Sequence, residues 1–351
     1  MALLFFWFVI SLFIKSTASF THKLSWFYIL GFIGFFIFAH FFWLDKLDNT
    51  SDFIRNQLHF IYILSGFFLT YYLQMELSKT QINRLVKACI LGVIVVVGIE
   101  TFFRFFLPTL DLNSESTDYL IEIYQGAQGG LSFDTFYFFK MSSIMFFDSN
   151  YVGAFLIIFL GLNMFVNYDS KFWRLASFTI IYFLIFLTLS RAAIVVSAGM
   201  GLYFVWNKWS SYSKWLTVLL SIGISILVLF FIQDQVQFQD GSFLTKLQIL
   251  EGLNGFFDQE IAIALMGLGY EVGGYLYSYM SGGYAHIHFA ILLGELGLLG
   301  LLVYLSFWYV IRLISGPRVL FLFIPFLIIG FSLADPWEIA YFWACGIIHK
   351  I

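Results

Sequence analysis

The chain has 351 residues, of which 61% are hydrophobic and only 11% charged, and its mean hydropathy is +0.88. These values exclude a soluble globular protein and are typical of an integral membrane protein. The formal net charge of −3 argues against nucleic acid as a partner, because nucleic-acid binding requires a basic surface.

Long apolar segments predict an all-α fold, a polytopic membrane helix bundle that forms one transmembrane domain over residues 1–351. A helix needs about 20 apolar residues to cross the hydrocarbon core of a bilayer, and about eleven segments approach this length. The expected spans are 2–14, 24–44, 58–75, 85–107, 147–166, 172–189, 191–206, 215–232, 286–311, 319–333 and 336–348.

The distribution of lysine and arginine predicts the orientation, because cytoplasmic loops of membrane proteins are rich in these residues. An alternating topology places most basic residues, but only Glu76 and Asp169 among the acids, on the cytoplasmic side. The N-terminus is then outside, and two larger outer loops cover 108–146 and 233–285. Both cysteines, Cys89 and Cys345, fall within expected spans, so no disulfide framework or cysteine-based metal site is expected.

Two pairs of polar residues lie at the outer ends of expected helices. Glu100 and Arg104 are four residues apart, so they either neutralise each other on one helix face or leave Arg104 to meet an anionic substrate. Asp148 precedes an apolar segment and is a candidate N-cap. It could instead contact a substrate together with Asn150.

Arg191 lies in the outer turn of a predicted helical hairpin, after Ser190. The arginine could reach water from the mouth of the hairpin, or it could bind an anion there. A guanidinium presents a planar set of donors that suits phosphate oxygens, and we favour this functional interpretation.

The long outer segment 233–285 ends at two histidines, His286 and His288, where a polar stretch meets an apolar helix. Histidine is well suited to proton transfer near neutral pH, which makes His286 the first candidate for catalysis. The segment is a candidate lid or acceptor platform. Glu295, nine residues after His286, is interpreted as a residue that hydrogen-bonds between helices.

Three motifs occur in an order that resembles the bacterial O-antigen polymerase and O-antigen ligase superfamily (Wzy/WaaL type). Asp148-Ser149-Asn150-Tyr151-Val152-Gly153 is similar to the family's asparagine-containing helix entry, and Ser190-Arg191 to its hairpin motif. His286 precedes Glu295-Leu296-Gly297-Leu298-Leu299-Gly300, which is similar to the family's histidine and Glu-Leu-Gly signature. The resemblance covers about residues 145–312.

The resemblance implies a GT-C-like membrane glycosyltransferase that needs no metal or cofactor. It implies that Arg191 holds the diphosphate of a lipid-linked sugar and that His286 assists glycosyl transfer. The family's usual asparagine after the histidine is Ile287 here, which leaves His288 as a substitute donor. The segment 233–285 also lacks the arginine that relatives commonly have there. The other candidates for substrate binding, including basic residues that could replace this arginine, are Asp148, Asn150, Lys246, Arg104 and Arg55.

The function expected is polymerisation of undecaprenyl-diphosphate-linked oligosaccharide repeat units at the periplasmic face of the bacterial inner membrane. Membrane lipid and a chain-length regulator protein are the other expected partners. Two alternatives stay open: an O-antigen ligase that transfers the glycan to lipid A-core, and a transporter or flippase of the lipid-linked sugar.

Overall fold

The computed structural model describes residues 20–42, 50–106, 139, 143–146, 148–206, 241–278, 283–331 and 335–351. Helices are the regular secondary structure of these residues, and no strand occurs among them. The α-helices are α2 (Phe20–Phe42), α3 (Thr50–Glu76), α4 (Lys79–Phe106), α7 (Ser149–Asn163), α8 (Lys171–Leu187), α9 (Arg191–Trp206), α11 (Gly241–Gly252), α12 (Ile261–Met266), α13 (His288–Ser315), α14 (Leu320–Ile329) and α15 (Ile339–Ile347). The 3-10 helices are η2 (Leu253–Asp258), η3 (Gly273–Tyr275) and η4 (Pro317–Val319).

The all-α prediction is confirmed for the described part of the chain. Each predicted apolar segment that lies there coincides with a helix, whereas 2–14, 215–232 and most of the predicted loop 108–146 lie outside the described residues. The predicted loop 233–285 is described over 241–278, and it contains α11, η2, α12 and η3. Its described part is therefore largely helical, and we call residues 241–278 the outer segment after the location predicted for them.

Within the described residues, two helices, α4 and α13, are long and apolar enough to cross a membrane. The segments 319–333 and 336–348 contain shorter helices than expected: α14 has 10 residues and α15 has 9. At 1.5 Å per residue these helices rise about 15 and 14 Å, half of the roughly 30 Å of hydrocarbon. A bundle of eleven full spans therefore stays a prediction.

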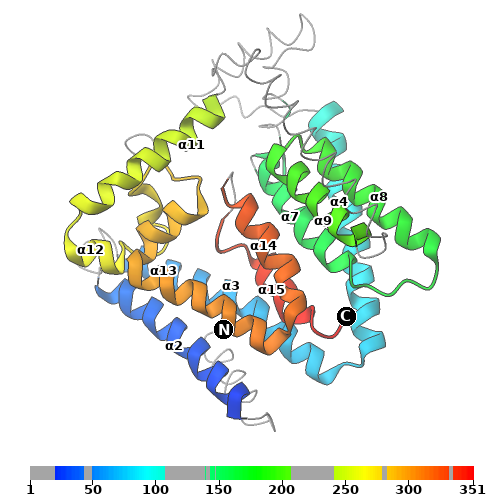
Figure 1. Cartoon of the computed structure of the whole chain (residues 1–351), viewed down its shortest axis with the longest axis horizontal. Coiled ribbons are helices and arrows are strands. Elements are labelled where there is room, and N and C mark those ends of the chain that lie inside the picture. The colour runs from blue at the N-terminus through cyan, green and yellow to red at the C-terminus, as the bar shows by residue number, and fades with distance from the viewer. Residues whose placement is uncertain are drawn as a thin grey trace, which may run out of the picture.

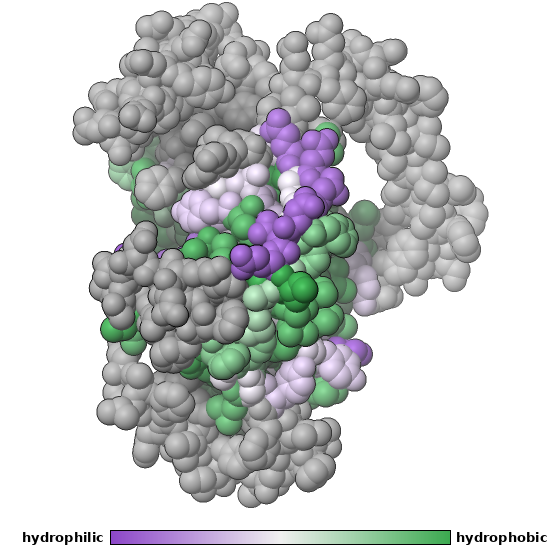
Figure 2. All heavy atoms as spheres, turned by 90° about the vertical axis from the view of Figure 1, so that its left-hand side faces the viewer, coloured by the Kyte–Doolittle hydropathy of each residue, from purple (hydrophilic) through white to green (hydrophobic). Residues whose placement is uncertain are grey.

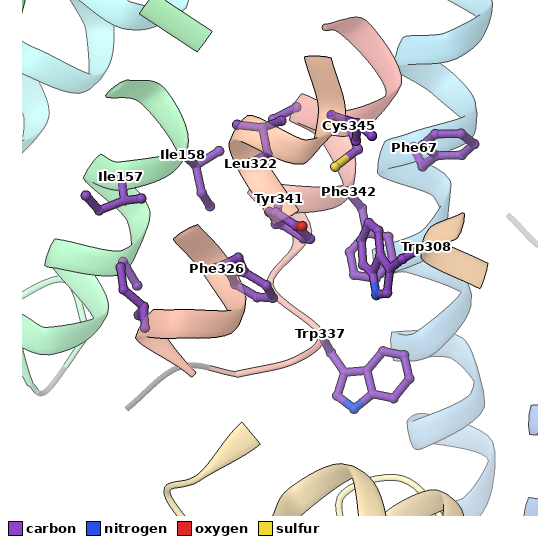
Figure 3. Close-up of a cluster of buried hydrophobic side chains, with 14 of the residues drawn as sticks. Phe67, Ile157, Ile158, Trp308, Leu322, Phe326, Trp337, Tyr341, Phe342 and Cys345 are labelled. Carbon is purple, nitrogen blue, oxygen red and sulfur yellow. The ribbon is translucent and has the colours of Figure 1, made fainter. Parts of the chain in front are cut away.

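Helices α14 and α15 lie in the middle of the molecule (Figure 1). Helix α15 packs along α3, and α14 packs against α7 and α9, so the pair joins the α2–α3–α13 side to the α7–α8–α9 side. Their apolar side chains form a buried core that is rich in aromatic rings (Figure 3). In it, Phe326 stacks on Tyr341 and Trp308 lies beside both Tyr341 and Phe342.

The side of the molecule formed by α11, η2 and α12 carries a band of hydrophilic residues next to apolar ones (Figure 2). Its exposed polar side chains include Glu251, Asn254, Asp258 and Glu260. Apolar side chains are exposed here as well, with Phe257 at 86% of its full accessibility.

Candidate functional site

The first part of the candidate site is the N-terminus of α7. Asp148 caps this helix: its carboxylate accepts from the Asn150 backbone N–H at 2.7 Å and from the Asn150 Nδ2 at 3.2 Å. The capping interpretation of Asp148 is confirmed. The Asn150 side chain is buried, with its amide directed to Asp148, whereas Asp148 itself is half-buried.

The N-terminus of α9 lies directly beside that of α7. Gly153 permits the approach, because a Cβ there would lie 2.8 Å from the Cβ of Ala193 and 3.1 Å from that of Ser190. Arg191 is the first residue of α9 and is exposed. A helix N-terminus carries partial positive charge and free N–H groups, so the arginine and two adjacent helix ends form a surface that favours anions.

Arg104 stabilises the turn between α8 and α9, next to this surface. It is fully buried, its Nε lies 3.4 Å from Glu100 Oε1, and its Nη2 donates to the Leu187 carbonyl at 2.9 Å. The Thr188 carbonyl accepts from Arg104 Nη1 at 3.4 Å and from Ser149 Oγ at 2.5 Å. These contacts satisfy the carbonyls at the end of α8 and fix the turn before Arg191. They favour the structural interpretation of Arg104 over substrate binding.

His286 lies in the non-helical stretch just before α13 and is half-buried. The predicted span 286–311 began two residues too early, since the helix starts at His288. Burial lowers the pKa of His286 below its ordinary value of 6.5; Asp148 opposes this effect and Lys246 adds to it. The imidazole is therefore neutral at neutral pH, which is the form required of a proton acceptor.

The electrostatic interactions of His286 also identify its neighbours. Asp148 directly precedes α7, Lys246 lies on α11 and His286 precedes α13, so charges from two distant parts of the chain act on the imidazole. Lys246 is half-buried. Two other residues that the sequence nominated are thus within electrostatic range of His286.

His288 occupies a different environment. It is 4% exposed, its backbone N–H donates to the Gly330 carbonyl at 2.8 Å, and its Nε2 lies 3.4 Å from the Tyr304 hydroxyl. The Phe326 ring packs edge-on against the imidazole. These contacts attach the start of α13 to the end of α14, and they favour a structural role over that of a substitute donor.

A second polar cluster, of which sequence reasoning named only Arg55 as a candidate, connects α3 to the outer segment. His59 Nδ1 lies 3.1 Å from both Glu271 Oε1 and the Tyr270 hydroxyl, and Asn56 donates to the Tyr270 carbonyl at 3.3 Å. Arg55 reaches Glu271 at 4.0 Å. A histidine inside an expected span was the available signal, since such residues are rarely without a function or a partner.

Asp335 and Glu338 flank the start of α15. Burial raises the pKa of the Asp335 carboxyl. A hydrogen bond from the backbone N–H of Trp337 at 2.9 Å and the nearby His59 partly offset this rise. Glu338 caps α15 by accepting from the Ala340 N–H at 3.2 Å. Among the described residues, no three His, Cys, Asp or Glu side chains are grouped so that they could hold a metal ion.

Comparison with known proteins adds no relative to these observations. No protein-family model matches the chain, and no curated protein is significantly similar to it.

Proposed function

We propose that the chain is a membrane glycosyltransferase that joins oligosaccharide repeat units carried on undecaprenyl diphosphate. The order of the three motifs suggests this activity. The observation that carries the proposal is that the N-termini of α7 and α9 adjoin, with Asp148 at one and Arg191 at the other, while the charges of Asp148 and Lys246 act on His286. A neutral imidazole and an anion-binding surface are the two groups that this transfer requires.

The anionic part of the substrate would bind at the N-terminus of α9. Arg191 donates to diphosphate oxygens, and the free N–H groups of the first helical turn stabilise the same charge. Lys246 supplies a second positive charge from α11, in the outer segment that contains no arginine. Lys246 is thus our candidate for the second phosphate-binding residue.

In the reaction, a hydroxyl of the acceptor sugar attacks the anomeric carbon of the donor glycan. A new C–O bond forms as the bond from that carbon to the lipid diphosphate breaks. His286 accepts the hydroxyl proton, and Arg191 stabilises the charge on the departing diphosphate. Diphosphate is a good leaving group, so positioning and charge stabilisation supply much of the rate enhancement.

The proposed site faces the periplasm of a multi-spanning inner-membrane protein. Two long apolar helices, α4 and α13, support insertion in a membrane, and the lysine and arginine distribution supports the orientation. In intact cells, an impermeant thiol reagent should label Asp258→Cys in η2 but leave Lys171→Cys at the start of α8 unlabelled. The opposite pattern would place the site in the cytoplasm and contradict the proposal.

The decisive experiment uses purified protein in liposomes with a fluorescent undecaprenyl-diphosphate-linked oligosaccharide. Wild type should form a ladder of longer products, and His286→Ala should lower turnover by about 10²–10⁴-fold, the range for a positioned general base. His349→Ala, which removes an exposed histidine near the C-terminus, is the matched control. Products that appear only when lipid A-core is added would identify a ligase instead.

A transporter of lipid-linked sugar is the second candidate, because α13 is interrupted at Gly297 and interrupted helices are typical of transporters. However, the backbone carbonyls of Gly294 and Glu295 at this interruption accept from Leu268 and Gly269. They are thus engaged by the protein itself. Movement of a labelled lipid-linked sugar across the liposome membrane without product formation would favour the transporter.

A further inference from the structure

The interruption of α13 is the attachment point of the outer segment. Gly297 has φ 65° and ψ −172°, which breaks the helix. The carbonyls of Gly294 and Glu295 accept instead from the backbone N–H groups of Leu268 at 2.8 Å and Gly269 at 2.9 Å. The Gly267-Leu268-Gly269 motif thus satisfies backbone groups that the broken helix leaves open.

Glu295 reinforces this attachment with its side chain. The carboxylate is fully buried; its Oε1 accepts from the Glu271 backbone N–H at 2.8 Å and its Oε2 from Trp337 Nε1 at 2.6 Å. One side chain therefore joins α13 to both the outer segment and the turn before α15. The predicted hydrogen-bonding role of Glu295 is confirmed, although its partners lie in connecting segments rather than in another helix.

Glu271 is held in an unfavourable backbone conformation by these contacts. Its φ is +64°, a region that costs a non-glycine residue about 1–2 kcal/mol. Such strain persists only where several contacts fix the residue. Here the N–H of Glu271 is bound by Glu295, while its carboxylate is bound by His59.

The contacts continue from Glu271 to the candidate catalytic histidine. Three residues later in the chain, the Gly274 carbonyl accepts from the Ala285 N–H at 2.7 Å. The rings of Tyr275 and Tyr284 meet edge-on at 5.1 Å. Ala285 directly precedes His286. The backbone next to His286 is therefore hydrogen-bonded to the outer segment, which Glu295 in turn binds.

We propose that Glu295 is a positioning residue for the transfer reaction, which fixes His286 through Glu271 and the 273–275 segment. The proposal rests on the proposed function in that His286 is the proton acceptor. Because Glu295 is fully buried, we assign its effect to holding the outer segment against α13 rather than to contact with substrate. Loss of its second acceptor should therefore change turnover more than donor binding.

The first test is kinetic and uses Glu295→Gln. Glutamine has nearly the same size, but it has one acceptor oxygen and would direct an N–H toward one of the two donors. We expect kcat to fall by about 10²-fold, the cost of a small misplacement at a reacting centre, with KM for the lipid-linked donor nearly unchanged. Trp337→Phe keeps one six-membered aromatic ring but loses the Nε1 donor together with the rest of the pyrrole ring. Measured per folded molecule, it should give a smaller loss of kcat of the same kind.

The double variant tests whether the two residues act together. If the Glu295–Trp337 hydrogen bond transmits the effect, the losses of the single variants should not add. Thr70→Val is the control, because Thr70 is also buried and donates to the Trp343 carbonyl at 2.9 Å between α3 and α15. It should lower stability without changing kcat per folded molecule.

A second readout does not depend on activity. In protein carrying Cys89→Ala and Cys345→Ala, the thiol of His286→Cys reports the local structure through its alkylation rate. We expect Glu295→Gln to raise this rate several-fold, whereas Thr70→Val should leave it unchanged. This result would support the positioning role even if wild type formed no glycan product, which would refute only the proposed function. An unchanged alkylation rate, or a kcat loss no larger than the loss of folded protein, would overturn the positioning role of Glu295.

Discussion

Replacing Gly297 by alanine should destabilise the protein, because alanine disfavours the backbone conformation that interrupts α13. Alanine at φ 65° and ψ −172° costs about 1–3 kcal/mol, because this backbone conformation is essentially restricted to glycine. The new Cβ would also lie 2.5 Å from the Gly267 backbone nitrogen, and overpacking of this kind costs about 1–3 kcal/mol. The two effects together predict a loss of about 2–6 kcal/mol in the free energy of unfolding.

The backbone contacts explain why this loss cannot be relieved easily. The neighbours of the new Cβ are main-chain atoms of Leu265 and Gly267, which cannot rotate away as a flexible side chain could. Displacing them would break the hydrogen bonds from Leu268 and Gly269 to α13, each of which contributes about 0.5–1.5 kcal/mol. The loss of these bonds would detach the outer segment from α13 and so change the candidate site as well as lower stability.

Thermal unfolding in detergent, followed by the folded fraction on size exclusion, measures this change. Gly34→Ala in α2 is the matched control, because nothing lies within 4 Å of a Cβ there. Helix propensity predicts that this control is unchanged or stabilised by up to about 1 kcal/mol. A Gly297→Ala protein that unfolds at the wild-type temperature would refute the interruption of α13.

Three further predictions concern the charges of the site. Arg191→Lys should lose most turnover in the liposome assay although it keeps the charge, since an ammonium cannot reproduce bidentate binding; Arg312→Lys, at an exposed arginine of α13, should match wild type. Because the pKa of His286 is lowered, the midpoint of the acidic decline of kcat should lie below pH 6.5; a decline centred above pH 7 would contradict the lowered pKa. Arg104→Met should cost about 3–5 kcal/mol in thermal unfolding, because it leaves the Glu100 carboxylate buried without its cation, and adding Glu100→Gln should restore much of this loss.

The sequence determined the helical class and most helix positions, because apolar length and composition are local properties of a segment. It also offered two local interactions among its alternatives, and the structure contains both. Asp148 caps α7, and Glu100 pairs with Arg104 one helical turn away. Both depend on residues within four positions of each other, which a helix brings together whatever the rest of the fold does.

Only the tertiary structure decided which polar groups meet. Arg104 reaches the end of α8, and the charges of Asp148 and Lys246 act on His286, across long stretches of sequence. The break at Gly297 has the same origin. An apolar run with glycines predicts a continuous helix, and the positive φ persists because the distant backbone N–H groups of Leu268 and Gly269 bind the carbonyls it releases. Those groups reach α13 only when the outer segment has folded onto it.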